Sequence, residues 1–383
     1  MSISPFDKTD QDTLIKIVKS DRWTMGQEVD KFEKAFAKYH GMKHAIKVNS
    51  GSSANLVAMA SLLYRSRGRL KPGDEVIVPA IAWSTTYSSL HQYGLKIRIV
   101  DVDLRTLTYD MDELEKSITK KTKMIVAVSI LGNPCNYAAM KKLCKKKNII
   151  LFEDNCESLG ARSKGKLTGT FGILNTFSFF FTHHISTIEG GMILTNDHEL
   201  FSLCRALRNH GWTRDQDTKS KIFTTKGDDF FEAYRFILPG YNLRPMEFSG
   251  ALGSNQLKKL TRFVKARRKN AKLFEHNFAD DPRFQIQEEL HGESSWFSFT
   301  MIVDPKIKIS RTKVLDQLKR KGIEYRCITG SNILDHDVVK QYDHSTRGCP
   351  NAGIVHRQGF FVANGPKDLR KEIDYLKKSL EVL

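Results

Sequence analysis

Two adjacent histidines, His183 and His184, follow an aromatic run and precede a Gly-Gly pair in the segment TFSFFFTHHISTIEGGMI, residues 176–193. An imidazole titrates near neutral pH, so His183 could take or give a proton in catalysis. The hydroxyl of Ser178, at the end of the apolar run, could bind a phosphate. Neighbouring side chains on an extended chain point to opposite sides. We therefore expect no metal site made of both histidines, and we interpret His184 as structural.

A second candidate is the segment NSGSSAN, residues 49–55, which lies between a strand pattern and a helical pattern. Small residues such as Gly51 and Ser52 allow backbone N–H groups to surround a phosphate at the start of a helix. Serine and glycine are also common in any turn from a strand to a helix. The segment alone therefore leaves both a phosphate site and a plain turn open.

Three further residues follow the ends of predicted strands. Asp154 ends the apolar run IILFED, and Glu157 comes three residues later. A carboxylate in this place can pair with a protonated ring nitrogen, as pyridoxal phosphate enzymes require. A helix cap or an acidic loop is the alternative. Trp83, in VPAIAWSTT, could stack on a flat cofactor ring, although tryptophan lies more often in a core or at an edge.

These residues fall at loop positions of an alternating strand and helix pattern. The runs HAIKV, DEVIVPA, KIRIVDVD, KMIVAVSIL, NIILFED and GGMILTN are short and rich in β-branched residues, and helical segments separate most of them. Continuous apolar strands between helices predict an α/β fold with a mostly parallel sheet covered on both faces. Sheets of this kind bind their ligands at the strand ends.

The C-terminal third follows a different pattern. A polar loop over residues 215–234 precedes a long helical pattern over residues 242–278, which we expect to bridge to a smaller region. The strands expected in that region are WFSFTMIV and GIEYRCI. We predict a large domain over residues 1–253 and a small α+β domain over residues 254–383.

The composition limits the class of protein. The chain has 383 residues, of which 40% are hydrophobic and 27% charged, as is typical of a globular protein. No apolar run reaches about 18 residues, and the N-terminus has no apolar signal region, so we expect a cytoplasmic protein with no membrane partner. The six cysteines show no C-x-C or C-x-x-C spacing, so we expect neither a zinc site nor an iron–sulfur cluster.

The net charge of +18 raises the question of nucleic acid binding. The basic clusters at residues 141–147 and 265–269 have helical spacing beside apolar residues, and we interpret both as solvated helix faces. No zinc-finger spacing or RNP-like aromatic motif accompanies them, so we expect no nucleic acid partner. A basic surface is equally suited to a substrate that carries phosphates.

Taken together, these segments resemble the DegT/DnrJ/EryC1/StrS family of pyridoxal phosphate enzymes, which act on nucleotide-linked keto sugars. The resemblance covers most of the chain and rests on the combination of MGQEVDKFEKAFAKYHGMKHAIKVNSGSSAN, GDEVIVPA, VDVDLRTLTYD, FEDNCESLGA, GTFG, FSFF and GYNLRPMEFSGALGSNQL. It implies fold type I, the aspartate aminotransferase-like fold, with a mostly parallel seven-stranded sheet in the large domain. It also implies a homodimer with shared active sites.

The chain departs from the family at one position. Most members have a lysine there that anchors the cofactor covalently, whereas this chain has His183, and no lysine occurs between Lys166 and Lys219. Within the family, a histidine in this place is typical of the sugar 3-dehydratases. One histidine-bearing branch carries an iron–sulfur cluster on cysteines that include a C-x-C pair, which this chain lacks. The resemblance therefore implies the branch without a cluster.

The resemblance also implies roles for individual residues. His183 and Asp154 would be catalytic, and the cofactor, pyridoxal or pyridoxamine phosphate, would be held by Gly51, Ser52, Trp83, Asp154, Glu157, Ser178 and Asn242. Asn242 lies in a loop that, in this family, crosses to the partner subunit. The candidates for substrate binding are Thr24, Met25, Gly26, His210, Arg214, Arg244 and Glu324, the first three in an N-terminal segment of the large domain. For His210 and Arg214, a surface loop after a helix is an equal alternative.

The activity that follows from the resemblance is removal of the C3 hydroxyl from a nucleotide-linked 4-keto-6-deoxy hexose. GDP-4-keto-6-deoxy-D-mannose is the preferred substrate and glutamate the amino donor, for dideoxysugar synthesis towards a surface polysaccharide such as O-antigen. Histidine can move a proton but cannot hold the cofactor covalently, so product release would need hydrolysis. The alternatives are a 4-aminotransferase with a remote lysine, a 3-dehydratase of another nucleotide sugar, and a non-catalytic nucleic-acid-binding or sensor protein.

Overall fold

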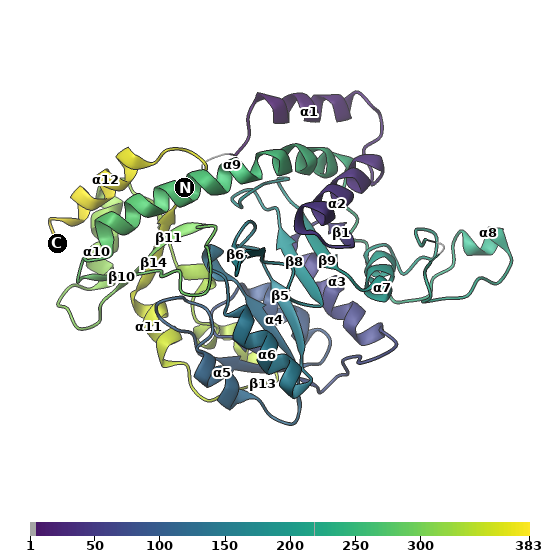
Figure 1. Cartoon of the computed structure of the whole chain (residues 1–383), viewed down its shortest axis with the longest axis horizontal. Helices are drawn as coiled ribbons and strands as arrows, with labels where there is room; N and C mark the ends of the chain where they lie inside the picture. The colour runs from purple at the N-terminus through teal and green to yellow at the C-terminus, as the bar shows by residue number, and fades with distance from the viewer. Residues whose placement is uncertain (1–4, 218) are drawn as a thin grey trace.

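The computed structural model describes residues 5–217 and 219–383 and shows two main β-sheets joined by one long helix (Figure 1). The larger sheet has the strand order β1-β9-β8-β5-β4-β2-β3-β13. Its strands are β1 (His44–Val48), β9 (Gly191–Thr195), β8 (Leu174–Ser178), β5 (Ile150–Asp154), β4 (Thr122–Val128), β2 (Glu75–Pro79), β3 (Lys96–Val100) and β13 (His344–Thr346). Neighbours from β8 to β13 are parallel, and β9 is antiparallel to both β1 and β8.

The expected mostly parallel sheet is confirmed, but the expected number of seven strands is wrong, because the sheet has eight. The eighth strand, β13, comes from the C-terminal part of the chain and pairs with β3. All three of its residues are exposed and polar. A short polar edge strand has no apolar run, so nothing in the hydrophobic pattern predicts it.

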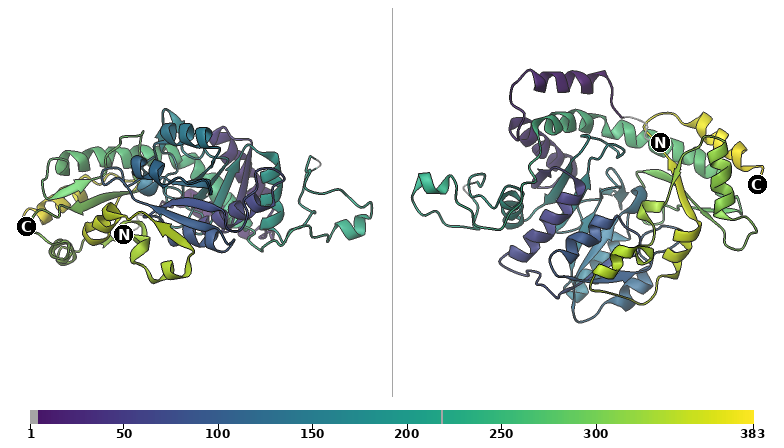
Figure 2. Two further views of the ribbon diagram at one scale, coloured as in Figure 1. Left: turned by 90° about the horizontal axis from the view of Figure 1, so that it is seen from below. Right: turned by 180° about the vertical axis from the view of Figure 1, so that it is seen from behind.

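Helices cover both faces of the large sheet (Figures 1 and 2). One face packs against α3 (Gly51–Tyr64), α4 (Ser84–His91) and α7 (His198–Arg208), and the other against α2 (Gln27–His40), α5 (Met111–Ser117) and α6 (Tyr137–Lys147). In β2, Val76 and Val78 pack in the first of these cores and Ile77 in the second. The strands are continuous apolar runs because both faces are buried.

Helix α9 (Glu247–Phe278) is 32 residues long and leads from the large sheet to the small one. The expected long helix is confirmed, but it begins five residues later than residue 242, because the segment before it contains Pro245, which disfavours helix in the preceding residue. The expected domain boundary at residue 253 lies within α9 and stays a prediction. Among the described residues, no helix combines the length and the apolar character needed to cross a bilayer.

The small sheet is antiparallel and has its own core around Phe274, Phe299 and Leu376. Its strands, in spatial order, are β10 (Phe284–Ile286), β11 (Ser298–Val303), β14 (Gly359–Ala363) and β12 (Tyr325–Arg326). The remaining elements of this region are α10 (Arg311–Arg320), α11 (Pro350–Gln358) and α12 (Arg370–Leu380). The strand expected over GIEYRCI is reduced to the two residues of β12. A hairpin of β6 (Arg162–Ser163) and β7 (Lys166–Leu167) completes the list of strands.

The N-terminal elements are anchored on α9. Helix α1 (Lys8–Val18) packs against α9, and the carboxylate of Glu247, at the start of α9, reaches the first turn of α2. This carboxylate accepts hydrogen bonds from the N–H groups of Gly26, Glu28 and Val29 over 2.9–3.0 Å. Because the N-cap residue of α2 is a glycine, Glu247 supplies the cap that α2 lacks.

One segment projects away from the body of the molecule (Figures 1 and 2). We call residues 219–240 the arm, which carries the short helix α8 (Asp229–Glu232). The polar loop expected over residues 215–234 falls mostly in the arm, whereas Thr218 and residues 1–4 lie outside the described residues. Phe230 and Tyr234 of the arm are 89% and 63% exposed. Clustered exposed aromatic side chains indicate a contact surface.

Candidate active site

A cavity of about 1190 Å³ opens at the carboxyl ends of β5 and β8 and is lined by residues of both sheets. This is the edge at which parallel sheets bind ligands. Eight predicted site residues line it: Gly51, Ser52, Trp83, Asp154, Glu157, Ser178, His183 and Glu324. Their individual roles stay predictions, which the following geometry supports.

The first part of the cavity is a cradle of backbone and hydroxyl groups. Helix α3 begins at Gly51 directly after β1, and Ser50 caps it by accepting a hydrogen bond from the N–H of Ser53. A Cβ at Gly51 would lie 2.5 Å from the Cβ of Ser178, and one at Gly191 would lie 2.1 Å from the carbonyl oxygen of Ser50. Three segments therefore meet more closely than any side chain permits. A helix N-terminus in such a cradle attracts an anion such as phosphate.

The buried carboxylate of Asp154 forms the floor of the cavity. Its Oδ2 accepts hydrogen bonds from Asn55 Nδ2 at 2.9 Å and from Thr86 Oγ1 at 2.8 Å, and its Oδ1 accepts one from the N–H of Cys156 at 3.2 Å. These donors fix the carboxylate in one orientation. Trp83, the residue before α4, lines the same cavity and is 58% exposed. The cavity thus offers a fixed acceptor and a flat apolar surface.

The imidazole of His183 stands between two aromatic rings. Its ring centroid lies 6.0 Å from that of Phe180 and 5.3 Å from that of Phe297, and both contacts are edge to face. Burial lowers the pKa of His183 to about 4, so the ring is neutral at pH 7. Nδ1 lies 3.3 Å from the carbonyl oxygen of Ser178, and the backbone of Cys156 is a second hydrogen-bond partner of the ring. In the tautomer with the proton on Nδ1, Nε2 can act as a base.

Glu157 is a second group with a shifted pKa. Its carboxylate accepts hydrogen bonds from the N–H of Leu131 at 2.9 Å and from the hydroxyl of Thr329 at 3.0 Å. Burial nevertheless raises the pKa of Glu157 to about 7. A carboxyl group that titrates near neutral pH can share a proton with a ligand hydroxyl.

No lysine lines the cavity in the described part of the chain. Among the described residues, Lys47 on β1 is the buried lysine. Its side chain lies in the core under α2, with Nζ over the rings of Phe32 and Phe179. Burial lowers the pKa of Lys47 to about 7, but this amine is not among the groups that line the cavity. No described lysine is therefore placed to hold a cofactor covalently in this cavity, as an aminotransferase would require.

The neighbour of His183 has a different environment. His184 is 1% exposed, and its Nε2 lies 3.2 Å from the carbonyl oxygen of Ser295, which agrees with a structural role. Across the described ranges, no group of three or more His, Cys, Asp or Glu side chains is placed to hold a metal ion.

Seven predicted site residues do not line the cavity: Thr24, Met25, Gly26, His210, Arg214, Asn242 and Arg244. Several of them are instead joined to one another near the base of the arm. Arg244 donates to Asn242 and to Asn209, and Asn209 forms a β-bridge with Asn242. Gly26 is held by Glu247, three residues after Arg244. Arg244, Asn242 and Asn209 are thus linked to one another outside the cavity of this chain.

Four contributors to the cavity were not predicted. Asn55 and Thr86 orient Asp154; Asn55 ends the segment of residues 49–55 that was considered for a phosphate, but no pattern in the sequence links either residue to Asp154. Arg311, at the start of α10, donates to the carbonyl oxygens of His356 and Gly359. Arg267 of α9 is 3% exposed, so the interpretation of residues 265–269 as a solvated face is wrong for this residue. Its helical spacing from the buried Phe263 would have placed it on the inner stripe.

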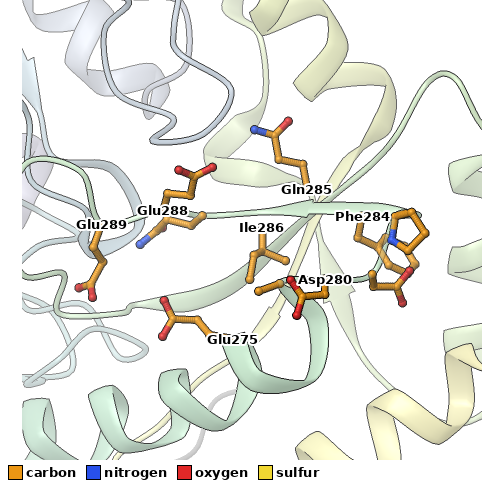
Figure 3. Close-up of a pocket in the computed structure, with 11 residues that line it drawn as sticks. Glu275, Asp280, Phe284, Gln285, Ile286, Glu288 and Glu289 are labelled. Carbon is orange, nitrogen blue, oxygen red and sulfur yellow. The ribbon is translucent and has the colours of Figure 1, made fainter.

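A second, smaller hollow of about 530 Å³ lies beyond the C-terminal end of α9, beside β10 (Figure 3). The carboxylates of Glu275, Asp280, Glu288 and Glu289 surround it. None of the predicted site residues lines it. The described residues that line the hollow include no Lys, Arg, His, Ser, Thr or Cys, so the histidine chemistry predicted from the sequence belongs to the large cavity.

The model of the DegT/DnrJ/EryC1/StrS aminotransferase family matches residues 5–380 of the chain. GDP-4-keto-6-deoxy-D-mannose 3-dehydratase of Escherichia coli O55:H7 is 44% identical over 384 residues, which cover 100% of this chain and 99% of that protein. Two crystal structures of GDP-4-keto-6-deoxymannose-3-dehydratase align with a TM-score of 0.97 at 44% identity and cover 99% of each chain. One is a histidine-to-asparagine variant with bound GDP-perosamine, and the other contains a trapped PLP-glutamate geminal diamine.

Proposed function

Because the chain belongs to the DegT/DnrJ/EryC1/StrS aminotransferase family, we propose that it is a pyridoxal phosphate-dependent sugar 3-dehydratase. Its substrate is GDP-4-keto-6-deoxy-D-mannose, and its amino donor is glutamate, as the similar proteins suggest. The observation that carries this function is His183, a neutral base in a cavity that no described lysine lines.

The residues present fit the cofactor. The cradle of Gly51, Ser52 and Ser178 has the donors that a phosphate needs. Asp154 offers Oδ1, which also accepts the N–H of Cys156, to a protonated ring nitrogen. Trp83 supplies a flat apolar surface for the ring. Glu157 would face the ring hydroxyl, because a carboxyl group with a pKa near 7 can share its proton.

In its amine form, the cofactor supplies an amino group that condenses with the 4-keto group of the sugar and a ring that accepts electrons. Asp154 keeps the ring nitrogen protonated and so maintains the electron demand of the ring. His183 takes the proton from the carbon that bears the amine, C4′, through the unprotonated nitrogen of its neutral ring. The protonated His183 then gives a proton to the hydroxyl that leaves C3. One imidazole serves both transfers because it is neutral at the start.

Release of the product follows from the missing lysine. An aminotransferase lysine displaces the product from the cofactor with its own amine, but His183 has no amine with which to do so. Water therefore releases the sugar as a 4-keto-3,6-dideoxy product together with ammonia. The oxygen lost from C3 leaves as water, and glutamate, which becomes 2-oxoglutarate, supplies the two electrons. The product is suited to dideoxysugar synthesis for a surface polysaccharide such as O-antigen.

The test combines the protein with pyridoxal phosphate, glutamate and GDP-4-keto-6-deoxymannose and determines the product by mass spectrometry. We expect loss of one oxygen atom from the sugar and one ammonia per sugar. A stable amino sugar without ammonia would replace this function with a 4-aminotransferase. Turnover of another nucleotide sugar in preference to the GDP sugar would retain the reaction and change the substrate.

The active enzyme is a homodimer in which each chain completes the site of its partner. Arg244 and Asn242 lie outside the cavity of their own chain, beside the arm with its exposed Phe230. Mixed dimers of His183→Asn and Arg244→Ala should regain activity that neither variant has alone, because one of the two sites is then intact. Absence of this regain, with subunit exchange shown by differently tagged chains, would place Arg244 in the site of its own chain.

The enzyme works in the cytoplasm in this proposal. All six cysteines are free thiols, which agrees with a reducing compartment. Fractionation of the producing cells, with activity assayed in each fraction, tests this location.

A further inference from the structure

Arg267 is a buried cation without a counter-charge. It lies in the middle of α9 and is 3% exposed. Its Nη1 donates to three main-chain carbonyl oxygens, those of Phe297 at 2.9 Å, Asn364 at 3.0 Å and Trp296 at 3.4 Å. Within residues 5–217 and 219–383, no carboxylate pairs with it and no acceptor meets its Nη2. Its Nε is buried and has no hydrogen-bond partner there.

A second buried arginine shows what is missing. Arg208 is 2% exposed and pairs with the carboxylate of Glu33 at 2.6 Å. Arg267 is equally buried but has only neutral partners. A buried charge without an opposite charge is costly, so a folded protein retains one where a ligand compensates it. The guanidinium of Arg267 therefore requires an anion that is not part of the described chain.

The position of Arg267 shows where that anion binds. Arg267 lines the large cavity together with His183. Phe297 lies between them, because its carbonyl oxygen accepts from Arg267 and its ring meets the edge of His183 at 5.3 Å. The anion is therefore held on the side of His183. The phosphate cradle is a different part of the cavity, built by the starts of α3 and β9.

We propose that Arg267 binds the α-carboxylate of the amino donor. The proposal rests on the proposed function, in which His183 moves the proton of the carbon that exchanges the amine. In an amino acid, the carboxylate is bonded to the same carbon that carries the amine, so it lies next to His183 when the donor reacts. The diphosphate of a nucleotide sugar is separated from the reacting C3 and C4 by the sugar ring. A planar guanidinium also matches a carboxylate in a bidentate geometry.

The test measures binding, with two stable ligands that differ by the amino acid. N-(5′-phosphopyridoxyl)-L-glutamate carries the carboxylates of the donor, and pyridoxamine phosphate lacks them. In Arg267→Met we expect the dissociation constant of the first ligand to rise by about 30-fold or more. That of pyridoxamine phosphate should change by less than about threefold, since only the carboxylate pair is lost. Arg267→Lys should retain part of the affinity.

The matched control is Arg268→Met, which changes the next arginine of α9, whose guanidinium pairs with Glu293. It should leave the affinity for both ligands unchanged. Equal losses for both ligands in Arg267→Met, or a loss that falls on GDP instead, would overturn the proposal. If wild-type protein binds neither ligand, both the proposed function and the role of Arg267 are refuted. Binding of pyridoxamine phosphate without the selective loss overturns the role of Arg267 alone.

A measurement on the wild-type protein avoids the risk that Arg267→Met does not fold. The phosphopyridoxyl adducts of glutamate 1-amide and glutamate 5-amide each lack the charge of one carboxylate. The 1-amide adduct should bind about 30-fold more weakly than the glutamate adduct, because it lacks the charge that Arg267 compensates. The 5-amide adduct should bind more tightly than the 1-amide adduct. Equal affinities of the two amide adducts would contradict the proposal.

Discussion

Gly191 offers a test of the proposed phosphate cradle, because its backbone lies against the start of α3. In Gly191→Ala, the new Cβ would lie 2.1 Å from the carbonyl oxygen of Ser50, 2.4 Å from its carbonyl carbon and 2.8 Å from the nitrogen of Gly51. All three are backbone atoms and cannot rotate away. Because Cβ contacts below 3.0 Å do not occur, the start of α3 must retreat by about 1 Å. Binding sites tolerate displacements of only about 0.5 Å.

The expected effect can be stated as an affinity. If the retreat breaks one charge-assisted hydrogen bond to the phosphate, binding weakens by about 1.5–3 kcal/mol, so the dissociation constant of pyridoxamine phosphate rises by about 10- to 100-fold. Overpacking also lowers the free energy of unfolding by about 1–3 kcal/mol. Absorbance titration of the apoprotein measures the first effect, and urea denaturation measures the second.

The control for this variant is Gly353→Ala in α11. There the nearest atom to the new Cβ is Nη1 of Arg357 at 3.2 Å, at the flexible end of a side chain. Alanine in a helix interior is about 0.5–1 kcal/mol more favourable than glycine, so we expect unchanged cofactor binding and equal or higher stability. If folded Gly191→Ala binds pyridoxamine phosphate as tightly as wild type, the phosphate does not lie in this cradle and the reasoning is refuted.

Three further predictions concern the histidines. His183→Asn retains a hydrogen-bonding amide but no base, so turnover should fall by about 10²–10⁴-fold while cofactor affinity stays within about threefold. A loss of cofactor affinity instead would show that His183 binds the cofactor rather than transfers protons. In NMR spectra of apoprotein with ¹⁵N-labelled histidine, the signal of His183 can be assigned through His183→Asn. It should report a neutral ring down to about pH 5, because burial lowers the pKa of His183 to about 4. A titration midpoint near pH 6.5 would mean that the site is solvated. Burial also lowers the pKa of His40 to about 4, so the stability that neutral His40 provides is complete above pH 6.5 and is lost as the pH falls from 6.5 to 4. In urea denaturation, His40→Leu should remove roughly 3 kcal/mol of this acid-induced loss of stability. The same pH dependence in both proteins would contradict the burial argument.

The strands and helices that position the cofactor residues could be predicted from the sequence. The central strands β2, β4 and β5 are rich in apolar residues because both their faces are buried, and Asp154 ends β5 while Ser178 ends β8. Strand β13 could not be predicted, because its pairing with β3 comes from backbone hydrogen bonds that leave no trace in three polar side chains.

The residues of the candidate site also differ in whether the sequence could predict them. His183 could be identified because it stands in a sequence position where the family has a lysine. Arg267 could not, because its environment is made by Trp296, Phe297 and Asn364, which are 29 to 97 residues away along the chain. The helical spacing from Phe263 places Arg267 on the inner face of α9, unlike the exposed Lys265 and Lys269, but its three carbonyl partners come only from tertiary packing.

The cap that Glu247 provides for α2 has a consequence for synthesis of the chain. Helix α2 ends at residue 40, but the N–H groups of its N-cap Gly26 and of Glu28 and Val29 have no carboxylate partner until Glu247, about 200 residues later, has been made. The apolar side chains Phe32 and Phe36 lack part of their packing for the same interval, because α9 covers them. At about 5–20 residues per second, this interval lasts roughly 10 to 40 seconds. During synthesis, the apolar face of α2 therefore stays without its α9 cover until α9 has been made.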